Sequence, residues 1–328
     1  MEKTNMEKLY DWLNHAAQII GSQDDAPYLD NLATAINVLF YQDTDGIDND
    51  IARKKLQTIL NKVTIDHYDK TDVSKAIHLA ILNGMKQSTQ QQHLMTPDTV
   101  SLLIGYLANK LMADKENVRL FDPVCGTGSL LMTVMDQLRM PVEAYASEVD
   151  PTLIQLASGS ANLLEKEIEF FHQDSLRPFL LDPVDLVVGD LPVGYYPDDV
   201  TAAAYKLKSD QGHSYAHHLL MEQSIHYTRD EGYLLFVIPN FLFESDQADK
   251  LRKFFLENVH IIGLLQLPDT AFKSKSNAKS ILILQKKSNQ SKDPKQPLLV
   301  NLPSFKNAKA MEDITVQMNA WFNRYLQR

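Results

Sequence analysis

The chain has a single cysteine, Cys125, among its 328 residues, so it cannot form an intrachain disulfide. No cysteine and histidine residues have the spacing of zinc ligands, so no metal is expected. The first eight residues are polar and lack the apolar core of a secretory signal. Apolar runs such as Leu234–Ile238 are far shorter than the roughly 20 residues that span a bilayer. These absences predict a cytoplasmic protein in a reducing compartment, with no membrane partner.

An excess of positive charge is also absent. The net charge of −10 argues against a protein that coats nucleic acid unaided, because phosphate binding rests on clustered Lys and Arg. The charge is unevenly distributed, however: residues 21–50 hold seven Asp and no Lys or Arg, whereas lysines gather in the segments Lys273–Lys279 and Lys286–Lys295. These two basic loops are either ordinary solvated segments or candidate contacts with nucleic acid.

Two kinds of pattern divide the chain. Residues 4–86 show only helical periodicity, as in the apolar series Leu9, Leu13 and Ala16, and contain no chemical motif. Beyond them, apolar strand-like segments alternate with helical ones, which indicates a mostly parallel sheet covered by helices on both faces. We therefore predict an N-terminal helical domain at residues 1–90 and a Rossmann-like α/β domain at residues 91–328. A protein partner or a second copy of the chain could bind the helical domain.

Seven segments of the second domain have the composition of strands. They are residues 118–121, 143–147, 168–172, 184–188, 233–238, 261–267 and 281–285. The short connection between the last two favours an antiparallel pair, and residues 309–327 have the pattern of a closing helix. At the start of the domain, Thr96 and Pro97 have the order of a helix N-cap followed by proline at the first helical position.

A glycine-containing turn follows the first predicted strand and precedes a helix. Its residues are Asp122, Pro123, Val124, Cys125, Gly126, Thr127 and Gly128. Glycine lets backbone approach a ligand closely, and the start of a helix offers free N–H donors. A dinucleotide site needs a third glycine where Leu131 stands, and a P-loop needs a lysine that is absent. Asp122 would repel a pyrophosphate but suits the cationic end of S-adenosylmethionine, so this cofactor is favoured.

Carboxylates also follow the next two predicted strands. Glu148 and its neighbour Val149 come 20 residues after Gly128, where a carboxylate can accept the ribose hydroxyls. Asp174 and Ser175 follow the third strand, where the carboxylate could accept the adenine amine. Each acid alone could be a helix cap or a solvated residue, but acids at three successive strand ends favour one nucleoside site. Cys125 has no nearby base, so packing explains it.

In these residues the chain resembles the adenine-specific DNA methylase-like family, which includes the modification subunits of type I restriction systems. The resemblance runs from about Gln92 to Lys286 and rests on the box Gln92–Pro97, the glycine turn, the two acids and the motif Asp190–Tyr196. A compact YtxK-like branch in Gram-positive bacteria is the most similar part of the family. The resemblance implies that Thr96, Pro97 and the glycine turn hold the methionine portion of the cofactor, and that the acids hold its ribose and adenine.

The last motif departs from the pattern of that family, which is Asn or Asp, two prolines and then Tyr or Phe. Leu191 replaces the first proline and Val193 replaces the aromatic residue, while Asp190 and Pro192 match. Tyr195 and Tyr196 follow two and three positions late and are candidates for the missing ring. The resemblance therefore implies a catalytic group of Asp190, Leu191, Pro192, Tyr195 and Tyr196, with Asp190 also bordering the cofactor. The alternative is that Asp190 caps a turn and the tyrosines are packed rings.

Three functions follow from these residues. The leading hypothesis is S-adenosylmethionine-dependent methyl transfer to an amino nitrogen, with adenine in DNA as the first choice. Asp190 and the Leu191 carbonyl would accept the hydrogens of that nitrogen, and a base in a duplex would have to be flipped out and stacked on a ring. An amide or amine of protein or RNA is the second acceptor class. The third hypothesis is a cofactor-binding regulator without transfer activity.

Overall fold

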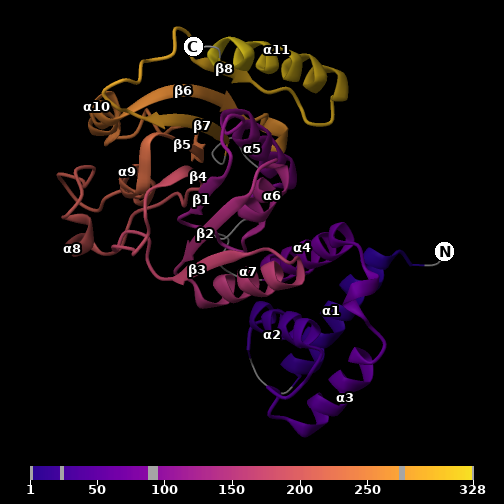
Figure 1. The fold of residues 1–328 in the computed structure, drawn as a ribbon. Helices are drawn as coiled ribbons and strands as arrows, with labels where there is room; N and C mark the ends of the chain where they lie inside the picture. The colour runs from indigo at the N-terminus through magenta and orange to yellow at the C-terminus, as the bar shows by residue number, and fades with distance from the viewer. Residues whose placement is uncertain (1–2, 23–25, 88–94, 273–277, 327–328) are drawn as a thin grey trace.

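The computed structural model describes residues 3–22, 26–87, 95–272 and 278–326. A bundle of helices forms one end of the molecule and an α/β unit forms the other (Figure 1). The predicted domain boundary between residues 90 and 91 lies outside the described residues. Within those ranges, no helix combines the length and the apolar character needed to cross a membrane.

The N-terminal bundle consists of α1 (Asn5–Gly21), α2 (Tyr28–Tyr41), α3 (Asp50–Leu60), the short η1 (Ile65–His67) and α4 (Lys70–Gln87). A reciprocal cap fixes the start of α1, because the Glu7 N–H donates to the Thr4 hydroxyl and the Thr4 N–H donates to the Glu7 carboxylate. The apolar positions of the helical periods, including Leu9 and Leu13, face one shared core.

The α/β unit contains one sheet of eight strands in the order β3-β2-β1-β4-β5-β7-β6-β8. Their bounds are β1 (Val118–Asp122), β2 (Val142–Glu148), β3 (Ile168–His172), β4 (Val184–Asp190), β5 (Thr228–Pro239), β6 (Val259–Gln266), β7 (Lys279–Lys286) and β8 (Leu298–Asn301). Seven strands were predicted, and each corresponds to an observed strand. The predicted antiparallel pair is confirmed as β6 with β7, and β7 also runs antiparallel to β5.

The predicted strand number was wrong by one, because β8 pairs in parallel with β6 at the edge of the sheet. This strand has only four residues, and prolines lie just before and just after it at Pro297 and Pro303. One of its residues, Leu298, is buried. Such a short edge strand carries too little alternation for a sequence pattern to reveal it.

Helices cover both faces of the sheet (Figure 1). They are α5 (Asp98–Leu111), α6 (Ser129–Gln137), α7 (Pro151–Leu163), α8 (Asp199–Ala202), α9 (Ala216–Tyr227), α10 (Ala248–Asn258), η2 (Asp269–Ala271) and α11 (Ala308–Leu326). Successive residues of a strand point to opposite faces. In β4, Leu186 and Val188 therefore join the core beneath α5, α6 and α11, whereas Val187 joins the core beneath α9 and α10.

Helix α7 connects the bundle with the sheet. Its residues Leu153, Leu156 and Leu163 belong to the core of the bundle, whereas Ala157 belongs to the core of the sheet. The two helices α2 and α7 approach so closely that a Cβ on Gly159 would lie 2.7 Å from Ile36 Cγ2. The bundle thus packs against α7, the helix that follows β2, and supports it.

Candidate functional site

Three acidic residues end neighbouring strands at one edge of the sheet. Asp122 ends β1, Glu148 ends β2 and Asp190 ends β4, and β1 lies between the other two strands. The chain leaves β1 toward β2 and β3 on one side, and β4 and β5 lie on the other. Ligands of open α/β sheets bind in the crevice at such a switch in strand order. The predicted acids therefore meet where this fold places a ligand.

Asp122 is the most deeply buried of these acids, with 1% of its surface exposed. Its Oδ1 accepts the Val124 N–H at 3.0 Å. Burial is the main cause that raises the pKa of Asp122 to about 8; the charges of Glu148 and Asp190 contribute to this shift, and the Val124 amide opposes it. Burial and the neighbouring carboxylates thus disfavour the ionised form of Asp122. A cationic ligand at this place would favour that form.

The glycine turn takes a conformation that needs its two glycines. Gly126 has a φ of +54° and Gly128 a φ of +75°, both in the left-handed region that L side chains seldom adopt. A Cβ on Gly126 would meet no atom within 4 Å, so open space lies before the turn. Gly128 then serves as the N-cap of α6. The turn therefore presents bare backbone to the crevice between the strand ends.

Cys125 lies inside this turn as a packed residue. Its N–H donates to the Ser147 carbonyl at 2.9 Å, and its own carbonyl accepts the Gly128 N–H at 2.8 Å. Burial raises the pKa of the Cys125 thiol, and the charges of Asp122 and Glu148 add to the shift. A thiol in this state is a poor nucleophile. Ser175 stabilises the turn, because its hydroxyl donates a hydrogen bond to the Pro123 carbonyl.

Glu148 is fixed by backbone amides on both carboxylate oxygens. Oε2 accepts the Gly126 N–H at 3.0 Å, and Oε1 accepts the N–H groups of Val149 and Asp150 at 2.8 and 2.9 Å. Asp150 has a different task, since its side chain caps α7 by accepting two amides of that helix. Glu148 thus couples the glycine turn to the start of α7, beside the exposed Val149.

Asp174, after β3, is bound to one of the predicted tyrosines. The Tyr196 hydroxyl donates to Asp174 Oδ2 at 2.5 Å, and the Leu176 N–H donates to Oδ1 at 2.9 Å. Burial raises the pKa of Tyr196, and the bond to Asp174 raises it further. The structure therefore places the Tyr196 ring in the core, where it positions Asp174 and does not face the open end of the site.

Asp190 is held by two side chains from distant parts of the chain. The Thr96 hydroxyl donates to Oδ2 at 3.0 Å and the Lys279 ammonium to Oδ1 at 2.5 Å. The predicted helix cap at Thr96 was wrong: α5 begins at Asp98 and Pro97 is its N-cap, with no side-chain cap. The Thr96 hydroxyl donates its hydrogen bond to Asp190 and not to the helix. No local sequence pattern marks the Lys279 contact.

The remainder of the motif after Asp190 is braced by the segment before α9. Leu191 is buried and donates its N–H to the Val237 carbonyl at 3.2 Å, while Pro192 is exposed. Tyr195 is 59% exposed, and its ring stacks on that of Tyr215 with centroids 4.9 Å apart and planes inclined by 13°. Sequence reasoning missed Tyr215, because no motif includes it. An exposed, paired aromatic surface thus lies close to Asp190 in the chain.

Two fully buried histidines, His217 and His218, support this surface from α9. The His217 ring lies 5.1 Å from Tyr215, and the two imidazoles meet edge to face at 4.8 Å between centroids. Burial lowers the pKa of His217 to about 4 and that of His218 to about 3, so both rings are neutral at pH 7. Neutral buried rings of this kind serve packing.

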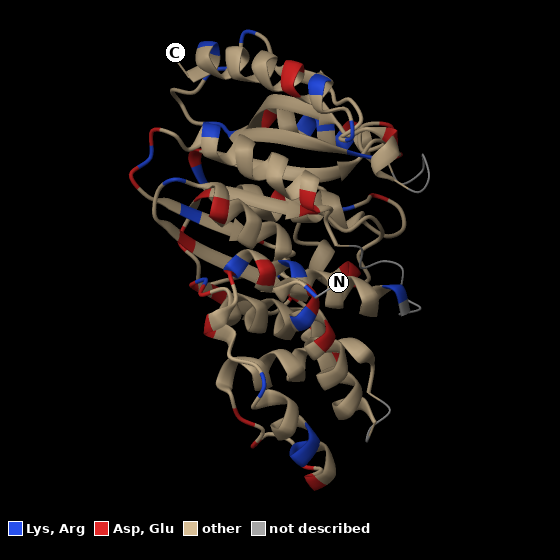
Figure 2. Cartoon of the chain, turned by 90° about the vertical axis from the view of Figure 1, so that its right-hand side faces the viewer, with Lys and Arg blue, Asp and Glu red and all other residues tan. Residues whose placement is uncertain are grey.

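The two basic segments lie in different places. Residues 273–277 lie outside the described residues, whereas Lys279 begins β7 at the edge of the sheet that carries Asp190. Lys286 ends β7, about 24 Å further along an eight-residue strand, where its ammonium donates to the Thr228 carbonyl at the start of β5. The Lys286–Lys295 segment therefore starts at the opposite end of the sheet. Acidic and basic residues interleave over the face seen in Figure 2.

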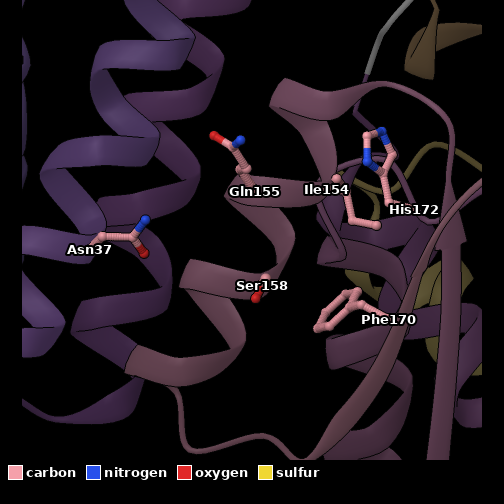
Figure 3. Close-up of a pocket in the computed structure, with 6 residues that line it drawn as sticks. All are labelled: Asn37, Ile154, Gln155, Ser158, Phe170 and His172. Carbon is pink, nitrogen blue, oxygen red and sulfur yellow. The ribbon is translucent and has the colours of Figure 1, made fainter. Parts of the chain in front are cut away.

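A separate hollow of about 270 Å³ lies along α7 (Figure 3). Asn37 of α2 borders it on one side, Phe170 and His172 of β3 border it on the other, and α7 contributes Ile154, Gln155 and Ser158. None of the predicted site residues lines it. The hollow thus belongs to the contact between the bundle and the edge of the sheet.

Comparison with known proteins agrees with this geometry. The sequence model of the N-6 DNA methylase family matches residues 72–318, and that of the YtxK N-terminal helical domain matches residues 7–85. The uncharacterized protein YtxK of Bacillus subtilis is 48% identical over 327 residues, which cover 99% of each chain.

Solved structures show the same architecture. A candidate class I S-adenosylmethionine-dependent methyltransferase of Listeria monocytogenes has 37% identity and a TM-score of 0.90, over 97% of this chain and 98% of its own. A type I restriction-modification methyltransferase subunit of Streptococcus thermophilus has 18% identity and a TM-score of 0.66, over 97% of this chain and 74% of its own.

Proposed function

The chain belongs to the N-6 DNA methylase family, and from that premise we propose that it transfers a methyl group from S-adenosylmethionine to a planar amino nitrogen, with adenine in DNA as the first acceptor. One observation carries the proposal: acids end the three neighbouring strands β1, β2 and β4, next to a glycine turn that has open space before it. This arrangement suits a cationic nucleoside donor beside a hydrogen-bond acceptor for the target nitrogen.

The residues present fit such a donor. The glycine turn with Asp122 would hold its methionine portion together with Thr96 and Pro97, Glu148 would hold the ribose, and Asp174 with Ser175 the adenine. Glu148 supplies negative charge, Asp122 can ionise when a cation binds beside it, and the turn offers bare backbone with room before it. When bound, the donor supplies a methyl group on a positively charged sulfur. The remaining task of the protein is to place the acceptor nitrogen in line and exclude water.

Binding of the donor is expected to release a proton near pH 7. The pKa of Asp122 is raised to about 8 by burial, so much of this carboxyl is protonated in the free protein. A cationic ligand favours its ionised form, so affinity should rise with pH until about pH 8. Calorimetry in buffers of different ionisation enthalpy measures the released proton. Asp122→Asn should bind the donor more weakly and release no proton; release unchanged in this variant would contradict the assignment.

The acceptor side of the site is the region around Asp190. Its carboxylate, fixed by Thr96 and Lys279, would accept the hydrogens of the amino group. Such preorganised acceptors stabilise charge that develops on nitrogen. The exposed Tyr195 ring, stacked on Tyr215, is the aromatic surface near the position where Val193 replaces a ring. This surface supports a flat acceptor such as a nucleobase.

A transfer assay with labelled donor tests the proposal. Bacterial DNA is expected to be labelled, with RNA and protein extract as parallel acceptors. Tyr195→Ala should raise the KM for DNA, because it removes the stacking surface, while donor affinity stays unchanged. Label confined to protein would overturn the adenine acceptor. Donor binding without labelling of any acceptor would overturn the transfer function and favour a cofactor-binding regulator.

The charge of the chain favours a protein amide as the second acceptor. With a net charge of −10, and with acidic and basic residues interleaved along the backbone in Figure 2, the chain has little to attract a polyanion unaided. We therefore propose that a partner protein or a second copy, bound through the helical domain at residues 1–90, strengthens the binding of a DNA acceptor. Exposed Tyr41 and Ile51 of that domain are available for such a contact.

A further inference from the structure

Lys279 holds Asp190 although no motif in the sequence includes it. Its Nζ lies 2.5 Å from Asp190 Oδ1, and the side chains of Lys279 and Asp190 are 27% and 15% exposed. We propose that Lys279 is a positioning residue of the transfer site, which fixes the orientation of Asp190 and balances its charge. This inference rests on the proposed function and adds to it a residue that determines how Asp190 meets the acceptor.

The orientation of Asp190 is fixed by a hydrogen bond to each of its carboxylate oxygens. Thr96 donates to Oδ2 and Lys279 donates to Oδ1. An ionised carboxylate has about four lone-pair directions, so about two remain for the N–H groups of an acceptor. Because the carboxylate cannot rotate freely, those directions are set before the acceptor arrives. This is the preorganisation that in-line transfer requires.

The backbone of Lys279 is itself well anchored. Lys279 is the first residue of β7 and pairs with Pro239 of β5, which lies next to β4. Its carbonyl accepts the Leu267 N–H at 3.2 Å. The backbone of Lys279 is thus fixed at the same edge of the sheet as Asp190. The strand order therefore places the lysine close enough to contact the carboxylate.

The charge of the pair explains why a lysine is placed here. Asp190 shares its edge of the sheet with Asp122 and Glu148, and its charge contributes to the raised pKa of Asp122. An unpaired carboxylate at Asp190 would attract the sulfonium before transfer, and binding the ground state in this way does not accelerate the reaction. Paired with Lys279, Asp190 offers acceptor oxygens without net charge. It then resembles the neutral Asn that the related motif pattern also allows.

A set of substitutions separates this role from a merely structural one. We expect Lys279→Met to lower kcat about 30-fold, and Asp190→Asn about tenfold, because each leaves one charge without its partner. The double variant, which has neither charge, should be no slower than Asp190→Asn alone. Lys279→Arg should retain most activity. Lys287→Met, directly after the far end of β7, is the matched control and should behave as wild type.

The outcomes are distinct. Losses that multiply to about 300-fold in the double variant would overturn the proposal, because they would show that Lys279 acts independently of Asp190. The unfolding midpoint of Lys279→Met should fall, since the mostly buried Asp190 carboxylate loses its partner, and Lys279→Arg should restore it. A large drop in the midpoint, with no rescue by Lys279→Arg, would assign Lys279 a structural role instead.

Donor binding tests the charge argument without any acceptor. Loss of the lysine charge should strengthen binding of cationic S-adenosylmethionine relative to neutral S-adenosylhomocysteine by about fivefold. Calorimetry on wild type, Lys279→Met and Lys287→Met measures this preference. An unchanged preference in Lys279→Met would overturn the charge role. If wild type binds the donor and labels no acceptor, the proposed function fails, while this preference still decides the role of Lys279.

Discussion

Replacing Asp190 by Ala is expected to lower the rate of methyl transfer about 10³-fold but to weaken donor binding only about fivefold, because the unpaired Lys279 ammonium repels the sulfonium. The substitution removes both oxygens that would accept the hydrogens of the target nitrogen. It also leaves the Thr96 hydroxyl and the Lys279 ammonium without their common partner. Single-turnover rates with labelled donor measure the first effect, and calorimetry measures the second.

A matched control is available at the other end of β4. Asp182 precedes that strand, is 86% exposed and approaches Arg119 at 3.6 Å. Asp182→Ala should therefore retain the rate of wild type. Full activity in Asp190→Ala would show that another group receives the acceptor. A parallel loss of donor binding would show instead that Asp190 serves mainly to hold the donor.

The strands and acids of the site could be predicted because they depend on short-range order. Asp122, Glu148 and Asp174 each lie at or just after the end of a predicted strand, and parallel neighbouring strands end at the same edge of the sheet, whereas Asp190 was identified from the family resemblance. The predicted strand at residues 168–172 agrees with β3 at both ends. Placing these acids at the same edge of the sheet therefore required only the order and direction of the strands.

The side-chain partners could not be predicted in the same way. Thr96 and Asp190 are 94 residues apart in the chain, and Lys279 and Asp190 are 89 apart. Their contacts depend on how α5 and β7 meet the end of β4, which no local pattern encodes. Thr96 was therefore assigned to a helix cap, for which its sequence neighbours are suitable. In the folded chain, the Thr96 hydroxyl donates a hydrogen bond to Asp190 instead.

The tyrosines show how a substituted motif is completed by distant residues. Both Tyr195 and Tyr196 were candidates for the ring that Val193 lacks, and their order in the chain did not distinguish them. The structure separates them, because Tyr196 is bound to Asp174 and Tyr195 is exposed on Tyr215. This segment pairs through its backbone with the residues before α9, and in that arrangement the Tyr196 ring is buried while the Tyr195 ring is exposed.

Replacing Glu148 by Ala is expected to weaken binding of S-adenosylmethionine by about 100-fold. The carboxylate is proposed to accept the ribose hydroxyls, and two hydrogen bonds to a charged group contribute about 3 kcal/mol or more in total. Its loss also leaves the amides of Gly126 and Val149 without their acceptor, which loosens the glycine turn. Calorimetry measures the affinity. Glu143→Ala, on the exposed part of the same strand, is the matched control.

A ligand that lacks one ribose hydroxyl separates lost contact from a loosened turn. Wild type should prefer S-adenosylhomocysteine over its 2′-deoxy analogue by about tenfold, which corresponds to one such hydrogen bond. If Glu148 receives the hydroxyl, this preference should disappear in Glu148→Ala, because neither ligand then has a partner there. If the substitution acts only through the turn, both ligands weaken equally and the preference survives. The ratio of two affinities thus tests the ribose contact independently of protein stability, since unfolding would affect both ligands alike.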